Sequence, residues 1–158
     1  MGITTFRIAS PDDYKKLVII VNQFDRYLSL EHGKASINNK ELARSRRYVK
    51  KYLSDSNAAY LIAENENHIV AYAFLSIEKD KPSLGFINEL FVDPEERQQG
   101  IAKLLINESI NWFRNKRAEN VQLTVHRTNK RAIQLYLASN FQPYESEYIE
   151  MRLPVSSS

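Results

Sequence analysis

One stretch decides how this chain folds: Glu89-Leu90-Phe91-Val92-Asp93-Pro94-Glu95-Glu96-Arg97-Gln98-Gln99-Gly100-Ile101-Ala102. It begins inside an apolar, β-rich segment, continues as a polar loop and ends in a helical stripe of apolar residues that runs to Phe113. Gly100, one of only four glycines, stands where the loop meets the helix. The first N–H groups of a helix lack intrahelical partners and carry partial positive charge, so they suit phosphate oxygens. Taken alone, the pattern leaves open a phosphate site and an ordinary tight connection.

Hydrophobic periodicity on both sides of this stretch predicts the other elements. We expect strands at 4–9, 59–63, 69–77, 85–92 and 121–125, helices ending near 30 and spanning 40–54, 102–113 and 130–139, and a strand pair over 141–153. Consecutive strands favour an antiparallel meander, and the helix after residue 100 allows one right-handed parallel crossover. The predicted fold class is therefore α/β (α+β), with a mixed, mostly antiparallel sheet flanked by about four helices.

Composition limits the possible functions. The chain has 158 residues, 43% hydrophobic and 26% charged, which predicts one domain over 1–154 and a flexible end at 155–158. Without cysteine it can form neither a disulfide nor a thiolate metal site, and its three scattered histidines predict no metal. No stretch resembles a membrane span or a secretion signal, so we expect a cytoplasmic protein without a membrane partner. Signatures of dinucleotide, P-loop, serine hydrolase and zincin sites are missing.

The net charge of +3 permits an anionic ligand without requiring one. The densest basic run is Arg44, Arg46, Arg47, Lys50 and Lys51. It can be read as a nucleic-acid surface or as the solvated face of an amphipathic helix. Apolar residues at helical spacing in the same segment favour the solvated face, so we expect no nucleic-acid partner.

Two motifs together resemble the GNAT family of N-acetyltransferases. The family's acyl-coenzyme A loop follows Arg/Gln-x-x-Gly-x-Gly/Ala after Val-x-Pro, and this chain has Arg97-Gln98-Gln99-Gly100-Ile101-Ala102 after Val92-Asp93-Pro94. The family also carries Asn-x-x-Ala-x-x-Leu-Tyr followed by a phenylalanine, matched here by Asn129, Ala132, Leu135, Tyr136 and Phe141. The resemblance covers about residues 60–153 and implies a single-domain GNAT-like fold with a splayed sheet. Asn140 replaces the family's frequent glycine, a change that left-handed backbone tolerates.

The resemblance implies acetyl-CoA as co-substrate. Backbone groups of Phe91 and Val92 are expected to pair with the pantetheine arm, and Asn129 to bond it. The loop would hold the pyrophosphate through N–H groups from Gln98 to Lys103, with Arg97 adding charge. The residues expected to bind acetyl-CoA are thus Phe91, Val92, Arg97, Gln98, Gln99, Gly100, Ile101, Ala102, Lys103, Asn129 and Tyr136.

Two side chains are candidates for catalysis. Tyr136 can donate a proton to the departing sulfur, or it can be a core tyrosine, because it shares a helix face with Ala132 and Leu135. Glu89 can act as general base, or it can only bind substrate or face solvent. Strand alternation predicts that Asn88 points to the opposite face from Glu89.

The predicted function is transfer of acetyl from acetyl-CoA to a primary amine by direct attack in a ternary complex. In this family the first two helices wall the acceptor cleft, which makes Tyr27, Glu31 and Glu89 candidate substrate ligands. A small-molecule amine is favoured over a protein N-terminus or lysine, because the chain is short. The alternative is a non-catalytic acyl-CoA-binding sensor or scaffold. Relatives of this size are often homodimers. The sequence does not identify the acceptor amine, nor does it decide between acetyl and a longer acyl group as the group transferred.

Overall fold

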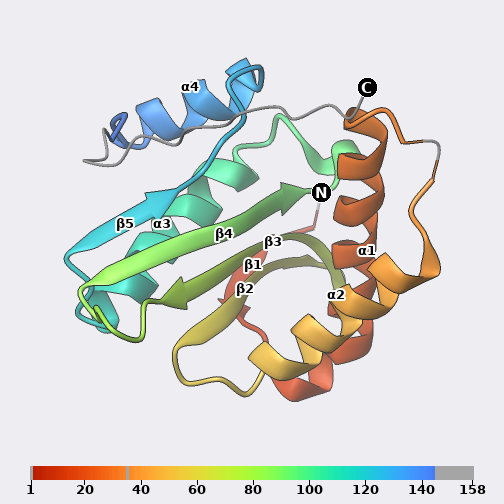
Figure 1. Cartoon of the computed structure of the whole chain (residues 1–158), viewed down its shortest axis with the longest axis horizontal. Coiled ribbons are helices and arrows are strands. Elements are labelled where there is room, and N and C mark those ends of the chain that lie inside the picture. The colour runs from red at the N-terminus through yellow and green to blue at the C-terminus, as the bar shows by residue number, and fades with distance from the viewer. Residues whose placement is uncertain (1, 35, 145–158) are drawn as a thin grey trace, which may run out of the picture.

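The computed structural model describes residues 2–34 and 36–144. Its elements follow the predicted order (Figure 1): β1 (Thr5–Ile8), η1 (Pro11–Asp13), α1 (Tyr14–Glu31), α2 (Asn39–Tyr52), β2 (Ala58–Asn65), β3 (His68–Ile77), β4 (Leu84–Val92), η2 (Pro94–Glu96), α3 (Ile101–Asn115), β5 (Asn120–Leu123) and α4 (Lys130–Ala138). Residues 141–144 form no strand, and the rest of the strand pair expected over 141–153 lies outside the described residues, as does the end at 155–158.

The sheet confirms the predicted topology. Within the described residues its five strands are ordered β1-β2-β3-β4-β5, with antiparallel pairing from β1 through β4 and parallel pairing between β4 and β5. The parallel pair needs a crossover, and α3 supplies it. The pairing between β4 and β5 joins Leu84–Ile87 to Asn120–Leu123 and stops there, so the two strands diverge beyond Ile87. This divergence, visible in Figure 1, is the splay that positions the site.

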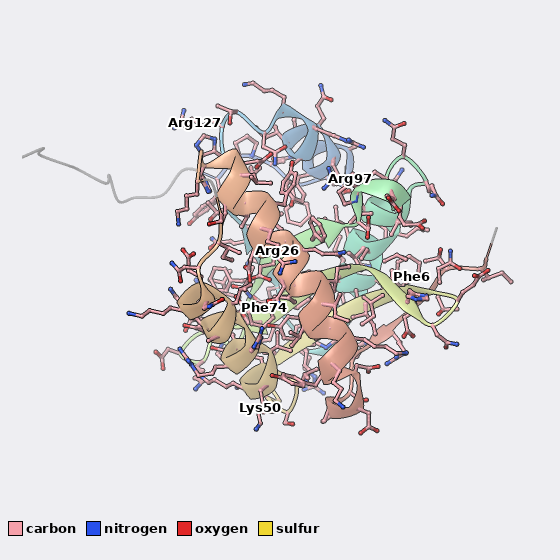
Figure 2. The ribbon with its side chains drawn as sticks, turned by 90° about the vertical axis from the view of Figure 1, so that its right-hand side faces the viewer. Phe6, Arg26, Lys50, Phe74, Arg97 and Arg127 are labelled. Atoms are coloured by element: carbon pink, nitrogen blue, oxygen red, sulfur yellow. The ribbon has the colours of Figure 1, made fainter. Side chains whose placement is uncertain are left out.

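Each face of the sheet carries its own hydrophobic core. On one face, Leu105 and Phe113 of α3 pack against strand residues such as Ala73 and Leu75, all nearly inaccessible to solvent. On the other face, α1 and α2 cover an aromatic cluster that includes Tyr60 and Tyr72. Figure 2 shows α1 and α2 crossing in front of the sheet, with Lys50 at their outer edge. Both layers follow from strand alternation, because neighbouring residues enter opposite cores.

β4 breaks that alternation at Asn88, and here the sequence prediction was wrong. β3 and β4 pair Phe74 with Glu89 but Leu75 with Ile87, so Asn88 is an extra residue in β4. Asn88 donates from Nδ2 to Ser76 Oγ at 2.8 Å. Ser76 lies two residues after Phe74 and therefore on the same face as it. Asn88 and Glu89 thus both point toward the α1–α2 side, because a β-bulge breaks the two-residue period.

Two smaller features complete the fold. The residues of β5 are half-buried or exposed. The basic residues of α2 lie on its exposed side, as predicted, while Val49 is fully buried. Within the described ranges, no helix has both the length and the apolar character that crossing a bilayer would require.

Candidate active site

The divergence of β4 and β5 opens a cavity of about 910 Å³. Its walls come from the second half of β4, the loop into α3, the segment after β5, and the adjoining ends of α1 and α4. Every predicted site residue except Gln99 lines it: Tyr27, Glu31, Glu89, Phe91, Val92, Arg97, Gln98, Gly100, Ile101, Ala102, Lys103, Asn129 and Tyr136. Gln99 instead turns outward and donates to Glu96 Oε2 at 3.1 Å.

The edge of β4 presents the backbone of Val92 to this cavity. The Asp93 N–H donates to the Val70 carbonyl of β3 at 2.9 Å. Because successive residues direct their backbone groups to opposite edges, those of Phe91 also face β3, where Phe91 pairs with Tyr72. The N–H and carbonyl of Val92 therefore face the gap. The predicted backbone pairing with a ligand falls to Val92, while Phe91 contributes its buried ring.

The loop before α3 has the shape of an anion cradle. Gln98 and Gly100 both adopt left-handed backbone, with φ of 64° and 78°. Gly100 is the N-cap, and the first intrahelical bond runs from Leu104 N to Gly100 O at 3.1 Å. The N–H groups of Ile101, Ala102 and Lys103 are therefore left for a ligand. A Cβ on Gly100 would meet no protein atom within 4 Å, so the space in front of the loop is open.

Arg97 lines the cavity beside the loop and also makes contacts that its motif does not specify. Its Nε donates to the Val92 carbonyl at 3.1 Å, and its guanidinium lies 5.1 Å from the Tyr27 ring centroid and 5.8 Å from that of Phe91. Figure 2 shows Arg97 beside the loop that leads into α3. The side chain thus links this loop to α1 and the end of β4. Cation–π contacts account for this position, which the sequence motif alone does not predict.

Glu89 is the central acid of the site. Its Oε2 accepts a hydrogen bond from the Tyr72 hydroxyl at 2.7 Å. This contact lies on the α1–α2 face of the sheet, to which the β-bulge directs the Glu89 side chain. Burial raises the pKa of Glu89, the Tyr72 hydrogen bond opposes that shift, and the nearby Asp25 carboxylate adds to it. Burial also raises the pKa of Asp25. A carboxyl group with a raised pKa can exchange a proton closer to neutral pH.

Tyr136 and Asn129 come from the other wall, at α4. Asn129 is the N-cap of α4 and accepts from Ala132 N through Oδ1 at 3.1 Å, which leaves its amide NH₂ free to donate. The Tyr136 ring packs edge-on against Phe141, with centroids 5.9 Å apart. Burial raises the pKa of Tyr136, so its hydroxyl keeps its proton at neutral pH.

A second cavity of about 480 Å³ lies between α1 and α2. Glu89 lines both cavities and therefore stands at their junction. Asp25, Glu41 and Arg44 also line the second cavity, whereas the candidate ligands Tyr27 and Glu31 line only the first. A hydrogen bond to Glu31 raises the pKa of Tyr27.

Sequence reasoning did not identify Tyr72 or Asp25. Tyr72 reaches Glu89 through the register of β3 and β4, whereas Asp25 approaches it from α1, so only the tertiary structure brings them close. Among the described residues, no group of three or more histidine or acidic side chains is arranged to hold a metal ion.

Comparison with known proteins agrees with this geometry. Residues 24–141 match the family model described as "Acetyltransferase (GNAT) family". The chain therefore belongs to the GNAT acetyltransferase family, as its two motifs predict. N-acetyltransferase 8 of the rat is 30% identical to it over 106 residues, covering 65% of this chain and 48% of that protein. The chain thus spans about half the length of this relative.

Solved structures share the fold. An aminoglycoside N-acetyltransferase, AAC(6')-Iy, solved with coenzyme A, aligns with a TM-score of 0.76 at 17% identity and covers 96% of each chain. A ribosomal-protein-alanine N-acetyltransferase from Brucella melitensis aligns with a TM-score of 0.69 at 16% identity, over 95% of this chain and all of that one. At such identities the likeness establishes the architecture, a GNAT α+β fold with a five-stranded mixed sheet.

Proposed function

We propose that this chain transfers an acetyl group from acetyl-CoA to a primary amine, both substrates being bound together. The observation that carries the proposal is the Val92 N–H, which faces the gap without a strand partner among the described residues, together with the glycine-capped start of α3 a few residues later. A backbone edge suits an amide-containing arm, and a helix start suits phosphates. Coenzyme A carries both groups on one molecule, and family membership points to the same co-substrate.

The residues present fit that co-substrate. The N–H groups from Gln98 to Lys103 would hold the pyrophosphate, and the open space at Gly100 accommodates it. The Asn129 amide and the Val92 backbone would hold the pantetheine. The Val92 N–H can also donate to the acetyl carbonyl oxygen as negative charge develops on it.

The proton transfers are assigned to Glu89 and Tyr136. An amine is protonated at neutral pH and must lose a proton before it attacks, and Glu89 would accept that proton. Its raised pKa suits this exchange. Tyr136 would give its hydroxyl proton to the departing thiolate. The raised pKa of Tyr136 keeps that proton available until sulfur leaves.

The second cavity would receive the acceptor. It meets the first at Glu89, so an amine entering between α1 and α2 reaches the base without passing the loop before α3, which lines only the first cavity. The carboxylates of Asp25 and Glu89 favour a cationic acceptor over an acidic one. A volume of about 480 Å³ suits a small amine, as in the aminoglycoside enzyme of the same fold. Because a ribosomal-protein-alanine N-acetyltransferase has the same fold, a protein N-terminus is the second candidate acceptor.

The test measures binding and turnover separately. Thermal unfolding with acetyl-CoA, with ATP and NAD as comparators, reports binding, and release of coenzyme A thiol with a panel of amines reports turnover. At a hundred times Kd, acetyl-CoA should stabilise the fold by about 2.7 kcal/mol. Binding without turnover on any amine or peptide would instead favour a non-catalytic acyl-CoA-binding module.

Glu89→Gln separates a base from a mere ligand. Glutamine keeps an oxygen that accepts the Tyr72 hydrogen bond, so we expect the fold to persist. Removing a general base should lower kcat by about 100-fold or more and remove the acidic limb of the pH–rate profile. If only the KM for the amine rises, Glu89 binds the acceptor and does not take its proton.

A further inference from the structure

The carboxylate of Glu89 is held asymmetrically. Oε2 accepts from the Tyr72 hydroxyl at 2.7 Å, whereas no hydrogen bond to Oε1 occurs among the described residues. Glu89 also lines both cavities. One oxygen is therefore tied to the sheet, and the other remains for a ligand.

Tyr72 itself cannot move away. It is fully buried, and its ring lies among aromatic neighbours, with centroids 6.2 Å from Phe24, 6.4 Å from Phe91 and 6.1 Å from Tyr60. A buried hydroxyl needs a partner, and Glu89 is the one it has. Burial and the Glu89 charge raise the pKa of Tyr72 well above its ordinary value, so the tyrosine keeps its proton and acts only as donor.

The β-bulge makes this contact possible. Tyr72 pairs with Phe91 in the register, and Glu89 lies two residues before Phe91 on the same strand face. The extra residue Asn88 precedes Glu89, so the alternation from Glu89 onward is set by its pairing with Phe74. The diagonal between Tyr72 and Glu89 is short enough for long side chains to meet.

We propose that Tyr72 is a positioning residue for Glu89: its buried hydroxyl fixes Oε2, so that Oε1 faces the acceptor and receives the amine proton. This inference rests on the proposed function. In the proton transfer, the ammonium N–H bond breaks and an Oε1–H bond forms, while the Tyr72 proton stays on tyrosine. Because the donor is fixed before substrate arrives, the base needs no reorganisation during the reaction.

Other ionisable groups also face Glu89. From the elements packed around it these are Asp25 of α1, His32 and Lys34 just after α1, Glu41, Arg44 and Tyr48 of α2, Tyr60 of β2, Tyr72 of β3 and, across the larger cavity, Tyr136 of α4. Glu41 is engaged by Lys34 at 2.9 Å. Asp25 raises the pKa of Glu89, and the Tyr72 hydrogen bond lowers it. Loss of the Tyr72 hydroxyl leaves the Asp25 effect in place, so the pKa of Glu89 must rise.

The experiment compares Tyr72→Phe with Tyr52→Phe. Both variants remove only a hydroxyl from the same aromatic cluster, because the Tyr52 ring packs 5.0 Å from Phe74, yet Tyr52 lines neither cavity. Carbon-detected NMR follows the Glu89 carboxyl through a pH titration, with Glu89→Gln to assign the signal. In Tyr72→Phe we expect the midpoint to rise by about one to two pH units, the size of one hydrogen bond to a charged group. In Tyr52→Phe it should stay at the wild-type value.

The pH–rate profile tests the second part of the proposal, that Glu89 receives the amine proton. In Tyr72→Phe the acidic limb of kcat/KM should move to higher pH by the same amount, with the KM for acetyl-CoA unchanged. An unmoved NMR midpoint overturns the role of Tyr72 while leaving the proposed function standing. A moved midpoint with an unmoved rate profile overturns the base role of Glu89, and the positioning role with it. Near-UV circular dichroism verifies that each variant keeps its packed core.

Discussion

Replacing Gly100 with alanine adds one carbon atom to the loop before α3 and tests whether that loop binds the pyrophosphate. The residue has φ of 78°, and an added Cβ meets nothing of the protein within 4 Å. The only intramolecular cost is therefore left-handed backbone, about 1–2 kcal/mol for a residue with a Cβ. In a domain of this size that cost lowers Tm by about 2–8 °C. The same methyl group would occupy the space in front of the α3 N–H groups, where we place the pyrophosphate.

The expected loss of binding is larger than the loss of stability. A hydrogen bond to a charged group contributes about 1.5–3 kcal/mol, so displacing one phosphate contact weakens Kd by about 10- to 150-fold. Isothermal titration with coenzyme A measures this directly. Temperature is kept well below the variant's Tm, so that unfolding does not contribute to the heat.

Gly33 provides the matched control. It has φ of 72°, its added Cβ also meets nothing within 4 Å, and it lies in the connection after α1, where it lines neither cavity and stands outside the loop before α3. Gly33→Ala should lose the same stability as Gly100→Ala and bind coenzyme A like the wild type. Equal affinities in both variants and the wild type would refute the pyrophosphate assignment. Equal losses in both variants would show that backbone strain, and not blocked space, causes the effect.

Two further substitutions probe other parts of the molecule. Tyr136→Phe keeps the edge-on packing with Phe141 but removes the proposed acid. Steady-state kinetics should therefore show kcat lowered by about 100-fold or more, with little change in the KM for acetyl-CoA. An unchanged kcat would mean that Tyr136 is only a core residue. Asp13 accepts from Arg7 at 2.7 and 2.8 Å and from Ser10 N at 2.7 Å, which holds the pKa of Asp13 well below its usual range. Asp13→Asn should therefore cost about 1–2 kcal/mol in urea unfolding at pH 7. Because the folded pKa is depressed, the wild type loses this advantage as pH falls below about 4, and the two stability curves should converge there.

The sequence was sufficient for the order of elements, because apolar periodicity and turn residues are local signals. It was also sufficient to locate the loop before α3, because Gly100 occupies a left-handed backbone position and the motif marks that position. It could not place Arg97, whose contacts with Tyr27 and the Val92 carbonyl depend on how α1 crosses the sheet. Nor could it predict the exposure of β5, because burial of a strand depends on which elements pack against it.

The bulge at Asn88 explains why Glu89 could be identified from the sequence but its contact with Tyr72 could not. In an uninterrupted strand Glu89 would share the face of Ile87, which is buried in the core beneath α3. A carboxylate there would be desolvated without a donor, a costly arrangement. The one-residue insertion turns Glu89 to the α1–α2 face, where Tyr72 donates to it and both cavities reach it. A single irregularity in backbone pairing therefore removes the charge from an apolar core, supplies its hydrogen bond and brings it to the junction of the two cavities.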